Sequence, residues 1–288
     1  MSGTARALVL SGGGTAGGAW MLGFIHGLRE KGVNLGDADL LVGTSAGARV
    51  GAQVVAGIID QGVSMYRQSR VPEMEAPVAL QDFAAAVMRV LAEAPDRREA
   101  ARRIANFEPL GGALVNEDAR RRMVAAHLPA DGWPRRRLEI TAVDAQSGAR
   151  VTFDADSGVA LLDAVTASGA LPGVFPLVRI KGTRYCDGGV HSPYNADLAA
   201  GHDVVIVLTP MAPDANRRRR ALLDAEIAAL GQATVRVITA DAASLAAIGP
   251  NPLSAVPAKA ALNAGVMQAA REHGTVKEIW DPRQYEAS

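Results

Sequence analysis

Hydrophobic and polar positions alternate along the chain in blocks that predict strands and helices in turn. Residues 7–10 form a short apolar run, followed by a glycine-rich turn and an amphipathic helix that Gly32 is expected to end. Residues 40–42 form a second apolar run, and another glycine-containing turn leads from it into a second helix. Strand, helix, strand and helix within about 60 residues is typical of a parallel sheet with helices on its faces.

The middle of the chain, about residues 60–137, has a different pattern. It is polar, its apolar residues have helical spacing, and it shows no clear strand. One segment predicts an amphipathic helix through apolar residues three and four positions apart: Leu80, Phe83, Val87, Met88 and Leu91. We expect this apolar face to cover the sheet, with a lid or a lipid-contact surface as the alternative.

Strand patterns return in the second half of the chain. The expected strands cover residues 138–143, 151–154, 178–180, 183–186, 204–208 and 235–238, and a helix is expected over 255–272. The sequence has neither an internal repeat nor a low-complexity linker. We therefore predict a single domain, 1–288, with a helical insertion at about 60–137 as a candidate lid. The fold class is α/β: a three-layer α/β/α sandwich with a mainly parallel central sheet.

Charge and cysteine content narrow the partners of this fold. The 30 basic and 30 acidic residues cancel, so the overall charge gives no reason to expect nucleic acid as a partner. The runs Arg135–Arg137 and Arg217–Arg220 are expected to be solvated, with contact to anionic lipid head groups as the alternative. The single cysteine, Cys186, is expected to be buried and structural, which fits a reducing compartment.

The sequence shows neither a targeting segment nor a metal-binding motif. The chain shows no secretion signal, and no apolar stretch approaches the ~20 residues of a membrane span. We therefore expect a cytoplasmic protein with at most peripheral membrane contact. No cluster of His, Cys or Asp has the spacing of metal ligands, so neither a metal nor a cofactor is expected.

The first motif that carries chemistry is the G-x-S-x-G sequence of residues 43–47, between an expected strand and an expected helix. A serine nucleophile must project from a tight turn, and Gly43 and Gly47 leave room for that turn around Ser45. The following helix points its N-terminus at the serine, which favours negative charge there. Such a short sequence also occurs by chance, but its strand-turn-helix context indicates a nucleophile.

The second motif is the glycine-rich turn of residues 12–17. Gly12, Gly13 and Gly14 leave backbone N–H groups uncovered at a helix N-terminus, where they can bind a phosphate or a tetrahedral oxyanion. With Gly17 the turn also satisfies G-x-G-x-x-G, the fingerprint of a dinucleotide-binding fold. That alternative needs an acidic residue at the end of the second strand, where this chain has residues 43–45, Gly-Thr-Ser.

The third motif is Asp187 followed by Gly188 and Gly189, directly after the apolar run that ends at Cys186. An acid at a strand end, next to two glycines, lies at the rim of a sheet and can be approached closely. Taken alone, Asp-Gly favours a simple turn.

Together, in this order and context, the three motifs resemble the patatin-like phospholipases. The resemblance covers about residues 7–193 and includes the block of residues 168–176, SGALPGVFP, upstream of Asp187. It implies a Ser–Asp dyad without a catalytic histidine, in which Ser45 is the nucleophile and Asp187 the general base. The N–H groups of Gly12, Gly13 and Gly14 would then form the oxyanion hole.

One position departs from the pattern of that family. The family usually carries Arg or Lys two residues after the third glycine, and this chain has Ala16 there. We expect the backbone donors of the loop to persist and a fixed positive charge near the loop to be absent. The departure leaves open whether anionic phospholipids are preferred.

The implied activity is hydrolysis of carboxylic esters of lipids, of the phospholipase A, lysophospholipase or carboxylesterase type. An acyltransferase that uses the same serine and a non-catalytic lipid- or nucleotide-binding module are the alternatives. The alternative mechanism is a Ser-His-Asp triad, for which His191 is the one histidine near a motif. The histidines of the chain are His26, His127, His191, His202 and His273.

Overall fold

Eight strands form one mixed sheet in the computed structural model, which describes residues 4–69, 80–108 and 116–281. Their order across the sheet is β5-β6-β3-β2-β1-β7-β8, and β4 pairs with β3 beside this row. The strands are β1 (Arg6–Leu10), β2 (Leu40–Thr44), β3 (Leu138–Asp144), β4 (Arg150–Phe153), β5 (Val178–Ile180), β6 (Thr183–Asp187), β7 (Val204–Thr209) and β8 (Thr234–Thr239). Each expected strand is present within two residues of its predicted ends.

The sheet is parallel in its centre and antiparallel at one edge. β2, β1, β7 and β8 run parallel, and β3 joins β2 in the same direction. Beyond β3 the direction reverses, because β4 and β6 both pair antiparallel with β3, and β5 pairs antiparallel with β6. The mainly parallel sheet expected from the sequence is confirmed, and this reversal at β6 determines where Asp187 lies.

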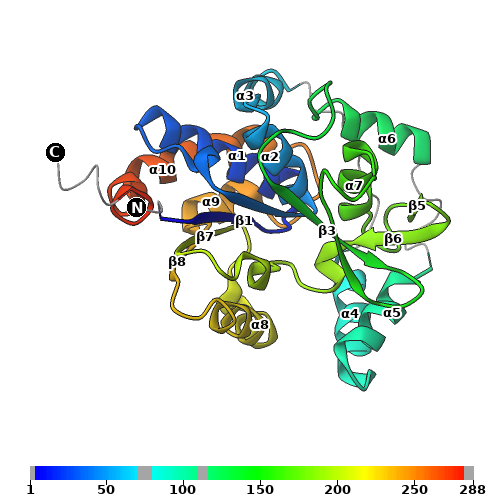
Figure 1. Cartoon of the computed structure of the whole chain (residues 1–288). Coiled ribbons are helices and arrows are strands. Elements are labelled where there is room, and N and C mark those ends of the chain that lie inside the picture. The colour runs from blue at the N-terminus through cyan, green and yellow to red at the C-terminus, as the bar shows by residue number, and fades with distance from the viewer. Residues whose placement is uncertain (1–3, 70–79, 109–115, 282–288) are drawn as a thin grey trace.

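Helices cover both faces of the sheet, which confirms the three-layer α/β/α class (Figure 1). Ala7 and Val9 of β1 face α8, while Leu8 and Leu10 face the side of α1 and α10. This split follows from the alternation of side chains along a strand, and strands that are apolar on both faces are typical of a covered parallel sheet. The helices are α1 (Gly14–Glu30), α2 (Ala46–Val55), α3 (Ile59–Arg67), α4 (Leu80–Glu93), α5 (Arg97–Ala105), α6 (Glu117–Ala125), α7 (Leu161–Ser168), α8 (Arg217–Ala228), α9 (Ala242–Ile248) and α10 (Ala258–Trp280).

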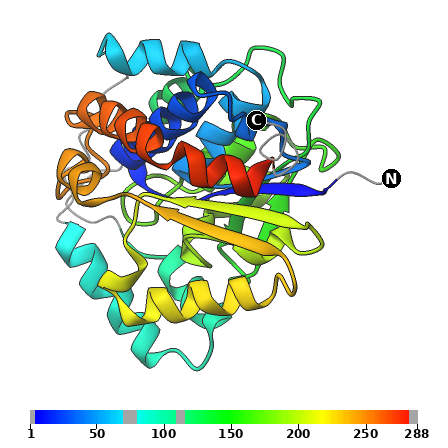
Figure 2. The same ribbon diagram turned by 90° about the vertical axis from the view of Figure 1, so that its left-hand side faces the viewer.

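Helices α1 and α10 pack along each other on one side of the sheet, as Figure 2 shows with α8 on the opposite side. Their backbones approach so closely that a Cβ on Gly23 would lie 2.1 Å from the carbonyl oxygen of Leu262. The Trp20 indole also donates a hydrogen bond of 3.2 Å to Gln268. This packing holds α1 firmly, and α1 carries the glycine-rich turn at its N-terminus. None of the helices in the described ranges is long and apolar enough to cross a membrane.

The helical middle of the chain departs from one expectation. Its described parts contain α3 to α6 and no strand, as predicted. However, α4 packs against α5 and lines a cavity with Phe83, Val87, Met88 and Leu91. The prediction that this apolar face covers the sheet is wrong, because α5 already fills that place. The side chain of Leu80 lies outside the described residues.

Cys186 is buried under α5, where Ala101 and Ala105 pack against it and Val143. Burial raises the pKa of its thiol above the ordinary value, which keeps it protonated and unreactive. The expectation of a buried, structural cysteine is confirmed.

Candidate active site

The strand register brings Ser45 and Asp187 to the same level of the sheet. Thr44, the last residue of β2, pairs with Thr141 of β3, so Ser45 stands level with the next β3 residue, Ala142. β4 pairs with residues 140–143 on one side of β3, so β2 and β6 follow one another along the other side, where Ala142 pairs with Asp187. The C-terminal ends of β2 and β6 therefore meet on this side of β3, which places Ser45 directly beside Asp187.

Ser45 occupies a strained turn between β2 and α2. Its φ of 55° and ψ of −116° lie in a region that residues with a side chain rarely adopt. The flanking glycines permit this turn, because a Cβ on Gly47 would lie 2.1 Å from the Leu10 carbonyl oxygen. A Cβ on Gly43 would lie 2.6 Å from the Cα of Ala48. The clash expected from larger residues at both positions is confirmed.

Asp187 ends β6 as a buried carboxylate. It accepts a hydrogen bond of 2.7 Å from the Gly189 N–H, and the Ser45 hydroxyl lies within hydrogen-bonding reach. Burial raises the pKa of Asp187 to about 6, although both hydrogen bonds and the positive charge of Arg120 act to lower it. Gly188 is needed here because a Cβ would lie 2.2 Å from the Thr141 hydroxyl oxygen.

The block of residues 168–176 accepts hydrogen bonds from the backbone N–H groups of both Ser45 and Asp187. The Ser168 hydroxyl accepts a 2.8 Å hydrogen bond from the Ser45 N–H, and the Ala170 carbonyl accepts one of 3.0 Å from the Asp187 N–H. The block therefore fixes the backbone of both residues from one side, which gives a physical reason for its place in the sequence pattern.

The glycine-rich turn passes directly over Ser45. A Cβ on Gly12 would lie 3.6 Å from the Ser45 Cβ. The Gly12 N–H already donates to the Pro193 carbonyl at 2.9 Å, so it is not free for a ligand. Within the described residues no acceptor is found for the N–H groups of Gly13 and Gly14, and both residues line the cavity. Of the three N–H groups expected to form the oxyanion hole, those of Gly13 and Gly14 therefore remain as candidate donors.

Gly14 and Gly17 support the shape of this turn. Gly14 has a φ of +64°, and a Cβ there would lie 2.5 Å from the Pro252 carbonyl oxygen. The Gly17 N–H donates to the Gly13 carbonyl at 3.1 Å, and a Cβ on Gly17 would lie 2.7 Å from Cγ of Pro210. Both glycines therefore act through close packing of the loop against neighbouring prolines.

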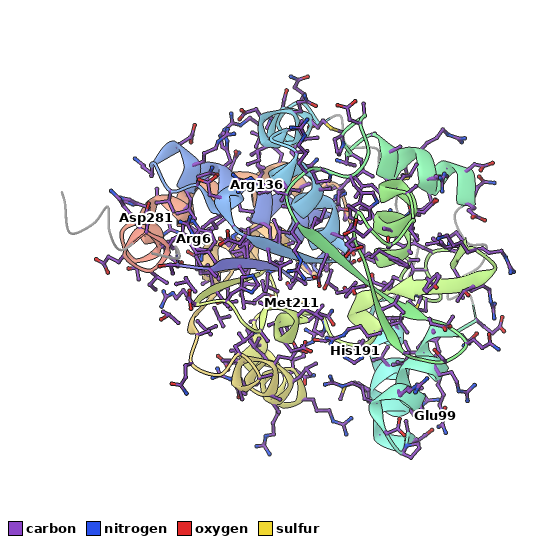
Figure 3. All side chains as sticks on the ribbon, viewed as in Figure 1. Arg6, Glu99, Arg136, His191, Met211 and Asp281 are labelled. Atoms are coloured by element: carbon purple, nitrogen blue, oxygen red, sulfur yellow. The ribbon has the colours of Figure 1, made fainter. Side chains whose placement is uncertain are left out.

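A cavity of about 660 Å³ opens at Ser45 and Asp187. Its apolar wall is formed largely by α4, and its polar wall includes side chains from α2 and α6. Met211 and His191, which also line it, lie between the sheet and the helices α8 and α5 in Figure 3. The site thus combines a hydroxyl, a carboxylate and bare amides with room for an elongated ligand.

The structure does not assemble a Ser-His-Asp triad from the described residues. His191 lines the cavity, but no hydrogen bond joins a histidine to Ser45 or Asp187. Burial lowers the pKa of His191 to about 4, aided by the charges of Arg150 and Arg97. No group of three His, Cys, Asp or Glu residues in the described ranges is arranged to hold a metal ion. His26 lies elsewhere, within 3.4 Å of Glu30 on α1.

Several polar side chains of the cavity were not given a role from the sequence, among them Arg49 of α2, Arg120 of α6, and His127. A Cβ on Gly18 would lie 2.7 Å from Nη2 of Arg49, so this guanidinium sits against the first turns of α1. The expected absence of a positive charge near the glycine-rich turn is therefore wrong. Arg49 lies four residues after Ser45, and helical spacing could have found it; Arg120 left no such signal.

A buried polar network supports the floor of the site. The Asn195 side chain donates 3.0 Å to the Thr44 hydroxyl, which is 2.9 Å from the Thr141 hydroxyl. Arg150 in turn donates to Asn195 and forms a two-pronged ion pair with Asp197 at 2.7 Å. These contacts connect β2, β3 and the segment after Asp187. No sequence motif predicted them.

The chain is thus an α/β protein that carries a serine on a strained turn beside a buried carboxylate. The family model "Patatin-like phospholipase" matches residues 8–200, and the chain belongs to this family of lipid hydrolases. The resemblance inferred from the three motifs is confirmed.

Solved structures give a weaker likeness. The crystal structure of VipD from Legionella pneumophila is 14% identical with a TM-score of 0.41, over 95% of this chain and 67% of VipD. The type III effector protein ExoU is 17% identical with a TM-score of 0.40, over 96% of this chain and 54% of ExoU. The chain therefore spans about half the length of ExoU. A search of curated proteins finds no match.

Proposed function

We propose that the chain hydrolyses carboxylic esters of lipids, with Ser45 as the nucleophile and Asp187 as the general base. The observation that supports this most strongly is the Ser45 hydroxyl on a strained turn, within reach of a carboxylate whose pKa is about 6. A free aspartate, with a pKa near 4, is a poor base at neutral pH, and burial brings Asp187 closer to the operating range. The family match supports the same class of reaction.

The proposed reaction has two steps that use the same groups. Ser45 Oγ attacks the ester carbonyl carbon and passes its proton to Asp187, while the N–H groups of Gly13 and Gly14 bind the oxyanion. The intermediate then expels the alcohol, which takes the proton from Asp187. Water attacks the acyl-enzyme with Asp187 again as base, which releases the acid and restores Ser45. The N-terminus of α2 favours the negative charge that develops there.

The cavity supports a lipid as the substrate. Phe83, Val87 and Leu91 of α4 form an apolar wall next to the reacting groups, as an acyl chain requires. Met88 is 40% exposed, and residues 217–220 at the start of α8 present four exposed arginines. We propose that the helical insertion acts as a lid and that this side contacts a membrane surface peripherally. A buried, lone Cys186 fits a cytoplasmic setting.

Labelling and turnover test the proposal together. Purified protein is treated with a fluorophosphonate probe and assayed on p-nitrophenyl butyrate and a lysophospholipid. We expect Ser45→Ala to abolish labelling and to lower turnover by about 10⁴-fold or more, and Asp187→Asn to lower it by about 10³-fold. The control is Ser64→Ala on α3, which does not line the cavity and should retain both signals.

Other outcomes would identify the alternatives. Absence of labelling in the folded wild type would leave a non-catalytic binding module. Acyl transfer to an added alcohol that outruns hydrolysis would indicate an acyltransferase built on the same serine. A near-complete loss of turnover in a folded His191→Ala variant would replace the dyad by a triad; the dyad requires this variant to remain active.

A further inference from the structure

Five arginines line the cavity; Arg97, Arg218 and Arg219 are exposed, whereas Arg49 and Arg120 are only partly exposed. Arg49 comes from α2 and Arg120 from α6, and no acidic side chain in the described ranges lies within 4.0 Å of either guanidinium. The Nε atoms of both are buried and have no hydrogen-bond partner there. Removing a cation from water is costly unless an anion compensates it, so two half-buried guanidinium groups that face one cavity favour a negative ligand.

Both guanidinium groups are held in defined seats. Arg120 stacks 4.2 Å above the Phe175 ring and donates 3.2 Å to the Gly169 carbonyl. A Cβ on Gly169 would lie 2.9 Å from Nη2 of Arg120, just as a Cβ on Gly18 would lie 2.7 Å from Nη2 of Arg49. Each guanidinium group therefore occupies a position that only a neighbouring glycine leaves open. Both groups are oriented before a ligand binds.

The charges in this part of the cavity favour an anion. Burial lowers the pKa of Arg120 to about 10 and that of His127 to about 2, and in both cases Arg49 adds to the effect. His127 is therefore neutral, and its Nδ1 is also buried without a partner among the described residues. Among the described residues, Asp187 is the acid whose charge raises the pKa of Arg120, and it is already engaged with Ser45 and Gly189.

We propose that Arg49 and Arg120 together bind the phosphate of a phosphate-bearing lipid substrate, and so supply the positive charge that position 16, an alanine, cannot. This rests on the proposed function, since the phosphate is placed relative to an acyl ester at Ser45. Arginine suits the role because its planar group binds phosphate through two parallel hydrogen bonds. In a glycerophospholipid only the glycerol carbons separate the phosphate from the acyl esters, which matches a cationic wall in the same cavity as the nucleophile.

A pair of substrates that differ only in the phosphate tests this directly. Octanoyl-lysophosphatidate and monooctanoylglycerol, both as monomers in solution, are compared by their kcat/KM values. We expect the wild type to favour the phosphate-bearing ester, and Arg49→Gln and Arg120→Gln each to lower the ratio of the two constants by about 10- to 100-fold, mainly through KM. Lysine at either position should restore part of it.

The matched control is Arg122→Gln on α6, two residues from Arg120, exposed and outside the cavity. It should leave the ratio within about twofold of wild type. If Arg49→Gln and Arg120→Gln lower both constants equally, the arginines act on catalysis or structure, and the phosphate site is wrong. If Arg120→Gln loses its thermal unfolding transition, Arg49→Gln and Arg120→Lys decide the matter.

Binding of inorganic phosphate provides a readout that needs no turnover. Calorimetry on the Ser45→Ala protein measures it with and without the Arg49→Gln change. Binding that Arg49→Gln weakens at least tenfold supports the site even if neither ester is hydrolysed, in which case only the proposed function fails. If Arg49→Gln changes the ratio of the two kcat/KM values but free phosphate does not bind measurably, the site recognises phosphate only when it is attached to a lipid. Hydrolysis of both esters with neither effect would overturn the site and leave the proposed function intact.

Discussion

The two walls of the cavity differ in how tightly they are specified. On the sheet side, Ser45 and Asp187 are each held by backbone hydrogen bonds, and neighbouring glycines leave no space for a Cβ. On the helical side, α4 presents half-exposed apolar side chains and packs mainly against α5. The comparison suggests that the sheet edge sets the chemistry within narrow limits, whereas the helical wall selects the substrate and tolerates change.

Gly47→Ala is expected to have the largest effect, because it disturbs the sheet side of the cavity. The added Cβ would meet the Leu10 carbonyl at 2.1 Å, so the Ser45 turn must shift. We expect kcat/KM to fall by about 10³-fold or more and stability to fall by about 3 kcal/mol, measured by ester hydrolysis and thermal unfolding. The control is Gly274→Ala in α10, where a Cβ meets nothing within 4 Å. A fully active Gly47→Ala protein would refute the tight sheet edge.

The next effect is on stability, through Asp187→Asn. The folded-state pKa of about 6 lies above the ordinary 3.8, so the neutral acid stabilises the fold below about pH 4, and that stability is lost as the pH rises through 6. Asparagine cannot ionise. We expect the variant to gain about 3 kcal/mol over wild type between pH 4 and pH 8 in denaturant unfolding. Exposed Asp131→Asn serves as the control and should show no such gain.

The pH dependence of turnover is expected to follow the same group. Asp187 accepts the proton only as a carboxylate, so kcat/KM should rise with pH through about 6 and level off above it. At pH 4 it should be about 100-fold below the plateau. The profile of His191→Ala should show the same inflection. An inflection that disappears in this variant would assign the titration to the histidine.

The smallest effect is expected on the helical wall. Val87→Phe adds volume to the apolar wall of the cavity, and should lower kcat/KM for long p-nitrophenyl esters relative to short ones by about threefold to tenfold. Ala85→Phe, on the exposed face of the same helix, is the matched control. If Val87→Phe abolished hydrolysis of all chain lengths, α4 would belong to the chemistry and the comparison would fail.

The strands and the three motifs were predictable from the sequence because their signals are local. An apolar run followed by glycine fixes a strand and its turn, and the G-x-S-x-G of residues 43–47 needs only its immediate neighbours. That the same edge of the sheet carries Asp187 depends on the antiparallel entry of β6, which no local pattern encodes. The expectation that Asp187 lies beside Ser45 came from the family resemblance, because the periodicity of the sequence does not predict it.

The remaining features depend on contacts between distant segments. Arg120 reaches the cavity because Phe175 and Gly169 shape its seat, and the face of α4 is turned by the position of α5. The Gly12 N–H is occupied by Pro193, a partner that only the folded chain provides. Such pairings leave no periodic trace, so the sequence could not separate free donors from occupied ones.

The double contact made by residues 168–176 has a consequence for the mechanics of the site. One short segment accepts hydrogen bonds from the peptide N–H groups of both Ser45 and Asp187. We expect thermal motion of this sheet edge to displace the hydroxyl and the carboxyl group together. We therefore expect the distance between the Ser45 hydroxyl and the Asp187 carboxylate to vary less than the width of the cavity around them.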